Sequence, residues 1–228
     1  MKAMAPWRRV LGSAVGAVDR AVVVAMQMRG ARDRARADKM GHAERIETLT
    51  AIHSAYGGDA IVEDAALFFP TPPSIDPALR PVRTGSPPRT EVWDAQWPST
   101  FAPYLDAVAE KYLAHVENRT ARARLFFGEL HAPQRPAVIA LHGYMGGHWM
   151  LEEAQWPIAW LTKRGLDVAL SVLPFHALRA GPRRGAPPFP SADPRLTNEG
   201  FRQAVADVVA LSRAGCASGA RPRSASWE

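Results

Sequence analysis

The chain has 228 residues, of which 47% are hydrophobic and 22% charged, a balance typical of a globular protein that excludes predominant disorder. Its single cysteine, Cys216, excludes a disulfide framework and a multi-cysteine metal site. The net charge of +6 comes mostly from arginine in a chain also rich in alanine, glycine and proline, as GC-rich genes encode. Because no RNA- or DNA-binding motif accompanies it, this charge predicts no nucleic acid partner.

Residues 1–69 are predicted to form a helical N-terminal extension. Asp19 and Arg20 interrupt the apolar run within residues 5–38, so this run fits neither a secretory signal nor a membrane-spanning helix. An amphipathic helix packed on the rest of the protein is the simpler interpretation, and a helix lying on a membrane surface is the alternative. A second helix is expected over residues 43–56. We therefore expect a cytoplasmic protein, with peripheral membrane contact as the alternative.

The proline-rich segment 70–90 is expected to be an irregular connector, because proline cannot donate a hydrogen bond inside a sheet. Residues 91–212 then alternate between helix and strand patterns. A helix is expected over residues 104–116 and a strand over 123–128. The continuous apolar run 137–141 predicts a strand that is buried on both faces, as in a parallel sheet.

The remaining elements complete an α/β pattern. A helix is expected around residues 149–164, followed by a strand over 167–172, a long loop over 173–196, and a helix that starts at Asn198. Strand, helix, strand, loop and helix in this order predict an α/β fold whose parallel sheet is covered by helices.

The loop after the buried strand carries the predicted chemistry. Its sequence, HGYMGG, occupies residues 142–147 and precedes a helix. Loops at the carboxyl ends of parallel strands are where α/β folds place ligands. Glycine lets the backbone turn sharply and approach a substrate, and free backbone N–H groups can stabilise the oxyanion of an acyl transfer.

Three motifs occur in order: HGY at residues 142–144, LPFH at 173–176, and N-E-G-x-R-Q-A at 198–204. Together they resemble the α/β-hydrolase fold, and within it the subgroup similar to α/β-hydrolase-domain-containing protein 18 and its bacterial relatives. The resemblance covers residues 90–212 and implies a partial parallel α/β-hydrolase sheet with flanking helices. It also implies a Ser-His-Asp/Glu hydrolase that acts on a small-molecule ester, thioester or amide, without a cofactor or metal.

The same resemblance assigns roles to residues of these loops. Gly143, Tyr144 and Met145 would form the oxyanion hole, with the backbone N–H of Tyr144 as its main donor. His142 would brace the loop, and His176 would line the pocket. A buried and hydrogen-bonded histidine is the simpler interpretation of both.

Two other polar features have simpler interpretations. Arg179, Arg183 and Arg184 could meet an anionic substrate, although a solvated loop is the default for such residues. Asn118 begins an Asn-Arg-Thr glycosylation pattern, which carries little weight because nothing else in the chain indicates secretion.

The catalytic serine is expected in a Gly-x-Ser-x-Gly elbow, a pattern that occurs nowhere in the chain. Residues 213–228 lack apolar periodicity and resemble a GC-rich gene translated in the wrong frame. Read from the third base of the Arg213 codon, the possible triplets allow an apolar strand leading into Gly-x-Ser. In this shifted frame, the triplet that spans the Trp227 and Glu228 codons can encode only glycine. We therefore expect a truncated or frameshifted chain whose nucleophile lies beyond Glu228.

The leading hypothesis is thus a truncated serine hydrolase that is inactive as given. An incomplete sheet would leave an exposed edge, which predicts poor solubility. One alternative is a non-catalytic binding or membrane-surface protein with the same α/β core. A weaker alternative is nucleic-acid binding driven by the +6 charge.

Overall fold

A computed structural model describes most of the chain between residues 41 and 214. The described residues are Val24, Met28, 41–58, 61, 63–69, 71–84, 90–128, 135–182, 187–191 and 193–214. The chain divides into two compact units, residues 1–51 and 52–228. The sheet and its helices lie in the second unit.

Helix α2 (His42–Tyr56) confirms the helix predicted over residues 43–56. Of the apolar run in residues 5–38, only Val24 and Met28 are described, and both are helical and exposed. The rest of that predicted helix and the 215–228 part of the aberrant tail lie outside the described residues. No helix of the described ranges is both long and apolar enough to cross a membrane.

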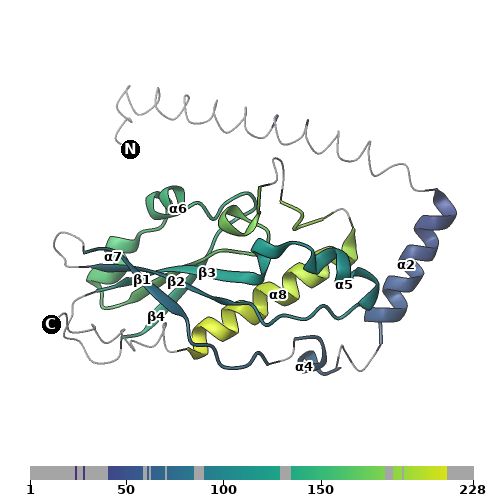
Figure 1. The fold of residues 1–228 in the computed structure, drawn as a ribbon, viewed down its shortest axis with the longest axis horizontal. Helices are drawn as coiled ribbons and strands as arrows, with labels where there is room; N and C mark the ends of the chain where they lie inside the picture. Colours follow the sequence, from purple (N-terminus) through teal and green to yellow (C-terminus); the bar gives the residue numbers. More distant parts are fainter. Residues whose placement is uncertain are drawn as a thin grey trace, which may run out of the picture. The chain divides into compact units, whose positions relative to one another are not determined.

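Five strands form one open mixed sheet (Figure 1), and their order is β1-β2-β3-β5-β4. They are β1 (Ala78–Thr84), β2 (Glu91–Pro98), β3 (Thr120–Phe127), β4 (Ala137–Leu141) and β5 (Asp167–Ser171). Only β4 and β5 pair in parallel, and the other three pairs are antiparallel. The α/β class is therefore confirmed, whereas the prediction of a parallel sheet is wrong for most of it.

The antiparallel part comes from segments that the sequence patterns do not identify. Strand β2 occupies a segment for which no strand is predicted, although its buried residues Val92, Ala95 and Trp97 line both faces. Strand β1 lies within the segment expected to be irregular, and this expectation is wrong for residues 78–84. Pro81 is accommodated because β1 is an edge strand, and the pairing register shifts between Pro81 and Arg83.

Six α-helices are present among the described residues. Besides α2 they are α4 (Ala65–Phe68), α5 (Asp106–Leu113), α6 (Trp149–Gln155), α7 (Ile158–Lys163) and α8 (Pro194–Arg213). The helix predicted over 149–164 is thus two helices, because Pro157 interrupts it and precedes the first residue of α7. Helix α8 starts at Pro194, before the predicted start at Asn198, and Asp193 caps it by accepting a hydrogen bond from the Arg195 N–H.

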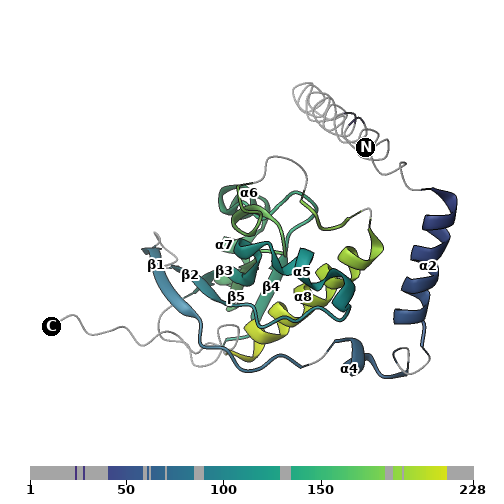
Figure 2. The same ribbon diagram turned by 45° about the vertical axis from the view of Figure 1, so that its right-hand side comes forward.

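The sheet lies between α6 and α7 on one face and α8 on the other (Figure 2), and it separates two apolar cores. Alternate residues of β3 point to opposite faces, so Leu125 and Phe127 join Leu211 of α8 in one core. Phe126 points to the other face, where Ile158 of α7 packs beside it. The helices between β4 and β5 therefore cover one face, and the helix after β5 covers the other.

The N-E-G-x-R-Q-A segment anchors α8 through buried polar groups. Glu199 is fully buried and accepts hydrogen bonds from the Tyr56 hydroxyl (3.0 Å) and from the backbone N–H groups of Tyr104 and Leu105. Arg202 lies 2.7 Å from the Glu199 carboxylate and donates from Nε to the Phe68 carbonyl. A buried charge needs this kind of pairing to be tolerated, so these residues position α8 rather than face solvent.

Gly200 of α8 packs directly against the Phe189 ring, and an added Cβ would collide with that ring. We expect Gly200→Ala to lower the free energy of unfolding by about 1–3 kcal/mol, because overpacking forces neighbouring side chains to move. Chemical denaturation of the purified protein measures this. Gly41→Ala, where a Cβ would meet open space, is the control. Equal effects of the two substitutions would contradict the packing argument.

Candidate functional site

The loops after β4 and β5 meet at one end of the sheet, because the two strands are parallel neighbours. Among the described residues, three non-glycine residues have positive φ: Met145 (65°), Phe175 (62°) and Ala177 (43°). All three lie in these two loops. Backbone strain of this kind concentrates at functional sites, so the strain and the topology indicate the same place.

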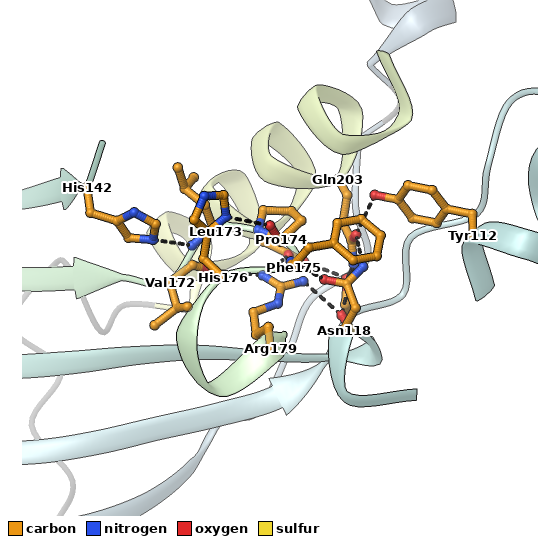
Figure 3. A network of polar contacts seen from close by, with 12 residues as sticks. Tyr112, Asn118, His142, Val172, Leu173, Pro174, Phe175, His176, Arg179 and Gln203 are labelled. Carbon is orange, nitrogen blue, oxygen red and sulfur yellow. Dashed lines mark hydrogen bonds and ion pairs between the residues drawn. The ribbon is translucent and has the colours of Figure 1, made fainter. Parts of the chain in front are cut away.

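The imidazole of His142 joins the two loops (Figure 3). Its Nε2 accepts a hydrogen bond from the Leu173 N–H (3.0 Å), so the ring proton lies on Nδ1 and is donated to the Gly143 carbonyl (2.8 Å). Burial lowers the pKa of His142, and the hydrogen bond that its Nε2 accepts from Leu173 requires the neutral ring. His142 therefore holds the loop after β4 against the loop after β5.

Glu152 of α6 holds the other end of the HGYMGG loop. Its buried carboxylate accepts hydrogen bonds from the Gly147 N–H (2.8 Å) and from the Trp156 indole N–H (3.2 Å). Gly147 has φ +93°, and a Cβ there would lie 2.7 Å from His142 Nε2. Only glycine fits this position, because both the backbone conformation and the contact with His142 exclude a side chain.

The residues predicted to form the oxyanion hole lie at the exposed tip of this loop. The side chains of Tyr144 and Met145 are 48% and 37% exposed. The Gly143 carbonyl accepts from the Gly146 N–H (3.0 Å) and closes a turn. The backbone N–H groups of Gly143, Tyr144 and Met145 donate no hydrogen bond to any residue that the structure describes. These three donors are therefore available to an external acceptor.

His176 lies beneath this tip and is 1% exposed. Its Nδ1–H donates to the Pro174 carbonyl (2.8 Å), and its Nε2 is buried without a hydrogen-bond partner among the described residues. Its ring contacts those of His142 and Tyr144, with centroids 4.9 and 6.1 Å away. Burial lowers the pKa of His176 to about 4, so the ring is neutral at physiological pH.

Arg179 is 1% exposed, so the expectation of a solvated loop is wrong for this residue. Its guanidinium lies 2.8 Å from the Asp207 carboxylate of α8 and donates to the carbonyls of Val172 and Asn118 (Figure 3). A charge this deeply buried cannot meet a substrate, and it fixes the loop instead. Arg183 and Arg184 lie outside the described residues.

Asn118 and Gln203 complete the support of the LPFH loop. Asn118 is 2% exposed, accepts a hydrogen bond from the Phe175 N–H (2.9 Å) and donates to the Gln203 carboxamide (2.7 Å). Gln203 also accepts from the Tyr112 hydroxyl (2.7 Å), and burial raises the pKa of that phenol. No sequence motif predicts this network. Its one signal is the spacing of Glu199, Gln203 and Asp207, which puts three polar residues on one face of α8.

Comparisons with known protein families, with curated proteins and with solved structures found no match. Within the described ranges, no three His, Cys, Asp or Glu side chains come together as ligands for a metal ion. The function is therefore inferred from the motifs and from the loop geometry.

Two glycines of the loop provide a matched pair. We expect Gly147→Ala to lower the free energy of unfolding by about 2 kcal/mol or more, because it strains the backbone and displaces His142. A Cβ at Gly143 meets nothing within 4 Å, so Gly143→Ala should leave stability nearly unchanged. Denaturant unfolding of both variants measures the difference, and equal stabilities would refute the proposed role of Gly147.

His176 predicts a pH dependence of stability. In the unfolded chain its ring takes up a proton near the ordinary histidine pKa of 6.5, whereas in the folded chain it does so only near a pKa of about 4. The free energy of unfolding should therefore fall as the pH is lowered between these values, by about 2 kcal/mol from pH 7 to pH 5. His176→Phe should remove this component from denaturation curves measured at both pH values. Replacing the exposed His148 is the control, and an unchanged slope in His176→Phe would contradict the prediction.

Proposed function

We propose that residues 91–212 are the amino-terminal part of an α/β-hydrolase domain, and that the HGY loop supplies its oxyanion hole. The observation that carries this proposal is the set of backbone N–H groups at Gly143, Tyr144 and Met145, which have no acceptor among the described residues. Donors of this kind stabilise the negative charge that develops on a carbonyl oxygen during acyl transfer. The substrate class is a small-molecule ester, thioester or amide.

The sheet topology supports the same proposal. Strand β5 is paired on both sides, whereas β4 has one partner among the described strands. Helices α7 and α8 cover opposite faces of the sheet. Because crossovers are right-handed, the connection from β4 to β5 through α7 runs one way across the sheet, and a connection from β5 through α8 runs back the other way. A parallel strand following α8 would therefore lie beside β4, and its carboxyl end would face the HGY loop. A nucleophile elbow belongs at that position.

The 228-residue chain contains no serine elbow, and oxyanion donors without a nucleophile do not form an acyl-enzyme. We propose that the elbow is encoded in the shifted frame after Arg213. Sequencing the gene tests this directly: an apolar strand followed by Gly-x-Ser should appear. Nucleotides that spell neither would overturn the frameshift.

The activity test compares the given chain with the frame-corrected protein. Only the corrected protein should hydrolyse p-nitrophenyl butyrate above background, and replacing its elbow serine by alanine should abolish the activity. Tyr144→Pro removes one oxyanion donor and should lower kcat by about 100- to 1000-fold. Tyr144→Phe keeps the N–H and is the control. Equal rates for the two folded variants would contradict the role of this N–H.

The proposed partners follow from the same hypothesis. We propose a cytoplasmic hydrolase with a small-molecule substrate and without a nucleic acid partner. Membrane-surface contact through residues 5–38 stays a prediction, since nearly all of those residues lie outside the described ranges.

A further inference from the structure

A second feature lies at the same end of the sheet, on the face covered by α6 and α7. It is a cavity of about 320 Å³, lined in part by Arg80 of β1, Gln96 of β2, Arg122 of β3, Trp149 and Leu178. Ala123 of β3 pairs with Ser171 at the carboxyl end of β5, so Arg122 lies beside the end of the parallel strands. The two arginines and the glutamine in its lining set this cavity apart from the apolar core.

Asp94 is the one carboxylate among the described residues that line this cavity, and it is already neutralised. Asp94 accepts two hydrogen bonds from Arg124, at 2.7 Å to Nε and 2.9 Å to Nη2. Arg124 also binds Glu153 of α6 (2.7 Å) and stacks on the Trp149 ring at 5.0 Å. Burial acts to lower the pKa of Arg124, but the carboxylates of Asp94 and Glu153 raise it. The Arg124 guanidinium is therefore charged and is paired with these two carboxylates.

The two arginines of the cavity have no such carboxylate. In the part of the chain that the structure describes, neither Arg80 nor Arg122 makes an ion pair. Arg122 donates from Nη1 to the neutral Gln96 carboxamide (3.0 Å), and its Nε–H is buried without an acceptor. Arg80 is exposed, whereas the Nε–H of Arg122 is a buried donor on a cation, and leaving such a donor unpaired is costly.

Strand pairing explains why both arginines face the same cavity. Arg80 pairs with Asp94, and Arg122 pairs with Gln96, so the four side chains project from one face of neighbouring strands. Guanidinium groups bind carboxylate and phosphate oxygens through paired N–H donors. Trp149 and Leu178 supply an apolar wall beside them.

We propose that this cavity binds a small organic oxyanion, a carboxylate or a phosphate carried on a short apolar or aromatic body. Arg80 and Arg122 bind the charged end, and Trp149 and Leu178 contact the body. The volume of about 320 Å³ is at the lower end for ligand sites, which favours a small molecule. The proposal does not depend on hydrolysis, because binding alone tests it.

The test is calorimetric titration of the full chain with inorganic phosphate, phenyl phosphate and benzoate at constant ionic strength. Benzyl alcohol is the uncharged reference. We expect phenyl phosphate or benzoate to bind at least tenfold more tightly than benzyl alcohol. The preference between these two ligands identifies phosphate or carboxylate as the preferred group. Tighter binding of phenyl phosphate than of inorganic phosphate supports the apolar wall.

Variants localise the binding. Arg80→Gln with Arg122→Gln should weaken binding at least tenfold, and Arg164→Gln with Arg213→Gln removes the same charge elsewhere as a matched control. Gln96→Glu gives Arg122 an internal carboxylate and should also weaken binding, without removing a folded-state contact. No binding of any anion would overturn the proposal. So would unchanged binding in Gln96→Glu, or an equal loss in the control pair.

Discussion

The hydrogen bonds between Gln203 of α8 and Asn118 ahead of β3 bring α8, α5 and the LPFH loop together at one buried point. Asn118 accepts from the backbone of the LPFH loop, its carbonyl accepts from Arg179, and Gln203 accepts from α5 through Tyr112. Because every one of these groups is buried, losing a single partner would leave others unsatisfied. The position of the LPFH loop, and through His142 that of the HGY loop, depends on this interaction.

Much of the second half of the chain could be predicted from its sequence. The apolar run 137–141 and the following glycine-rich loop locate β4 and the exposed donors of the site. The expectation that this strand is buried on both faces is wrong, because β4 has one strand partner among the described residues and Ala140 is its one buried residue. The N-E-G-x-R-Q-A motif locates α8, although its residues bind other parts of the fold.

Strands β1 and β2 of the antiparallel part could not be predicted from the sequence. Strand β1 contains a proline and lies at an edge, and β2 alternates apolar residues with Asp94 and Gln96. Partners distant in the chain decide whether such segments pair. The burial of Arg179 was unpredictable for the same reason, since its compensating carboxylate, Asp207, is 28 positions away in the chain and comes close only in the folded protein.

The hydrogen bonds of His142 leave its ring without a free lone pair. One nitrogen carries a proton donated to Gly143, and the lone pair of the other is occupied by the Leu173 N–H. The ring is therefore not available for chemistry. It cannot take up a proton, attack a carbonyl or bind a metal without breaking the hydrogen bond that joins the two loops. Any acyl transfer at this loop must draw its general base from another residue.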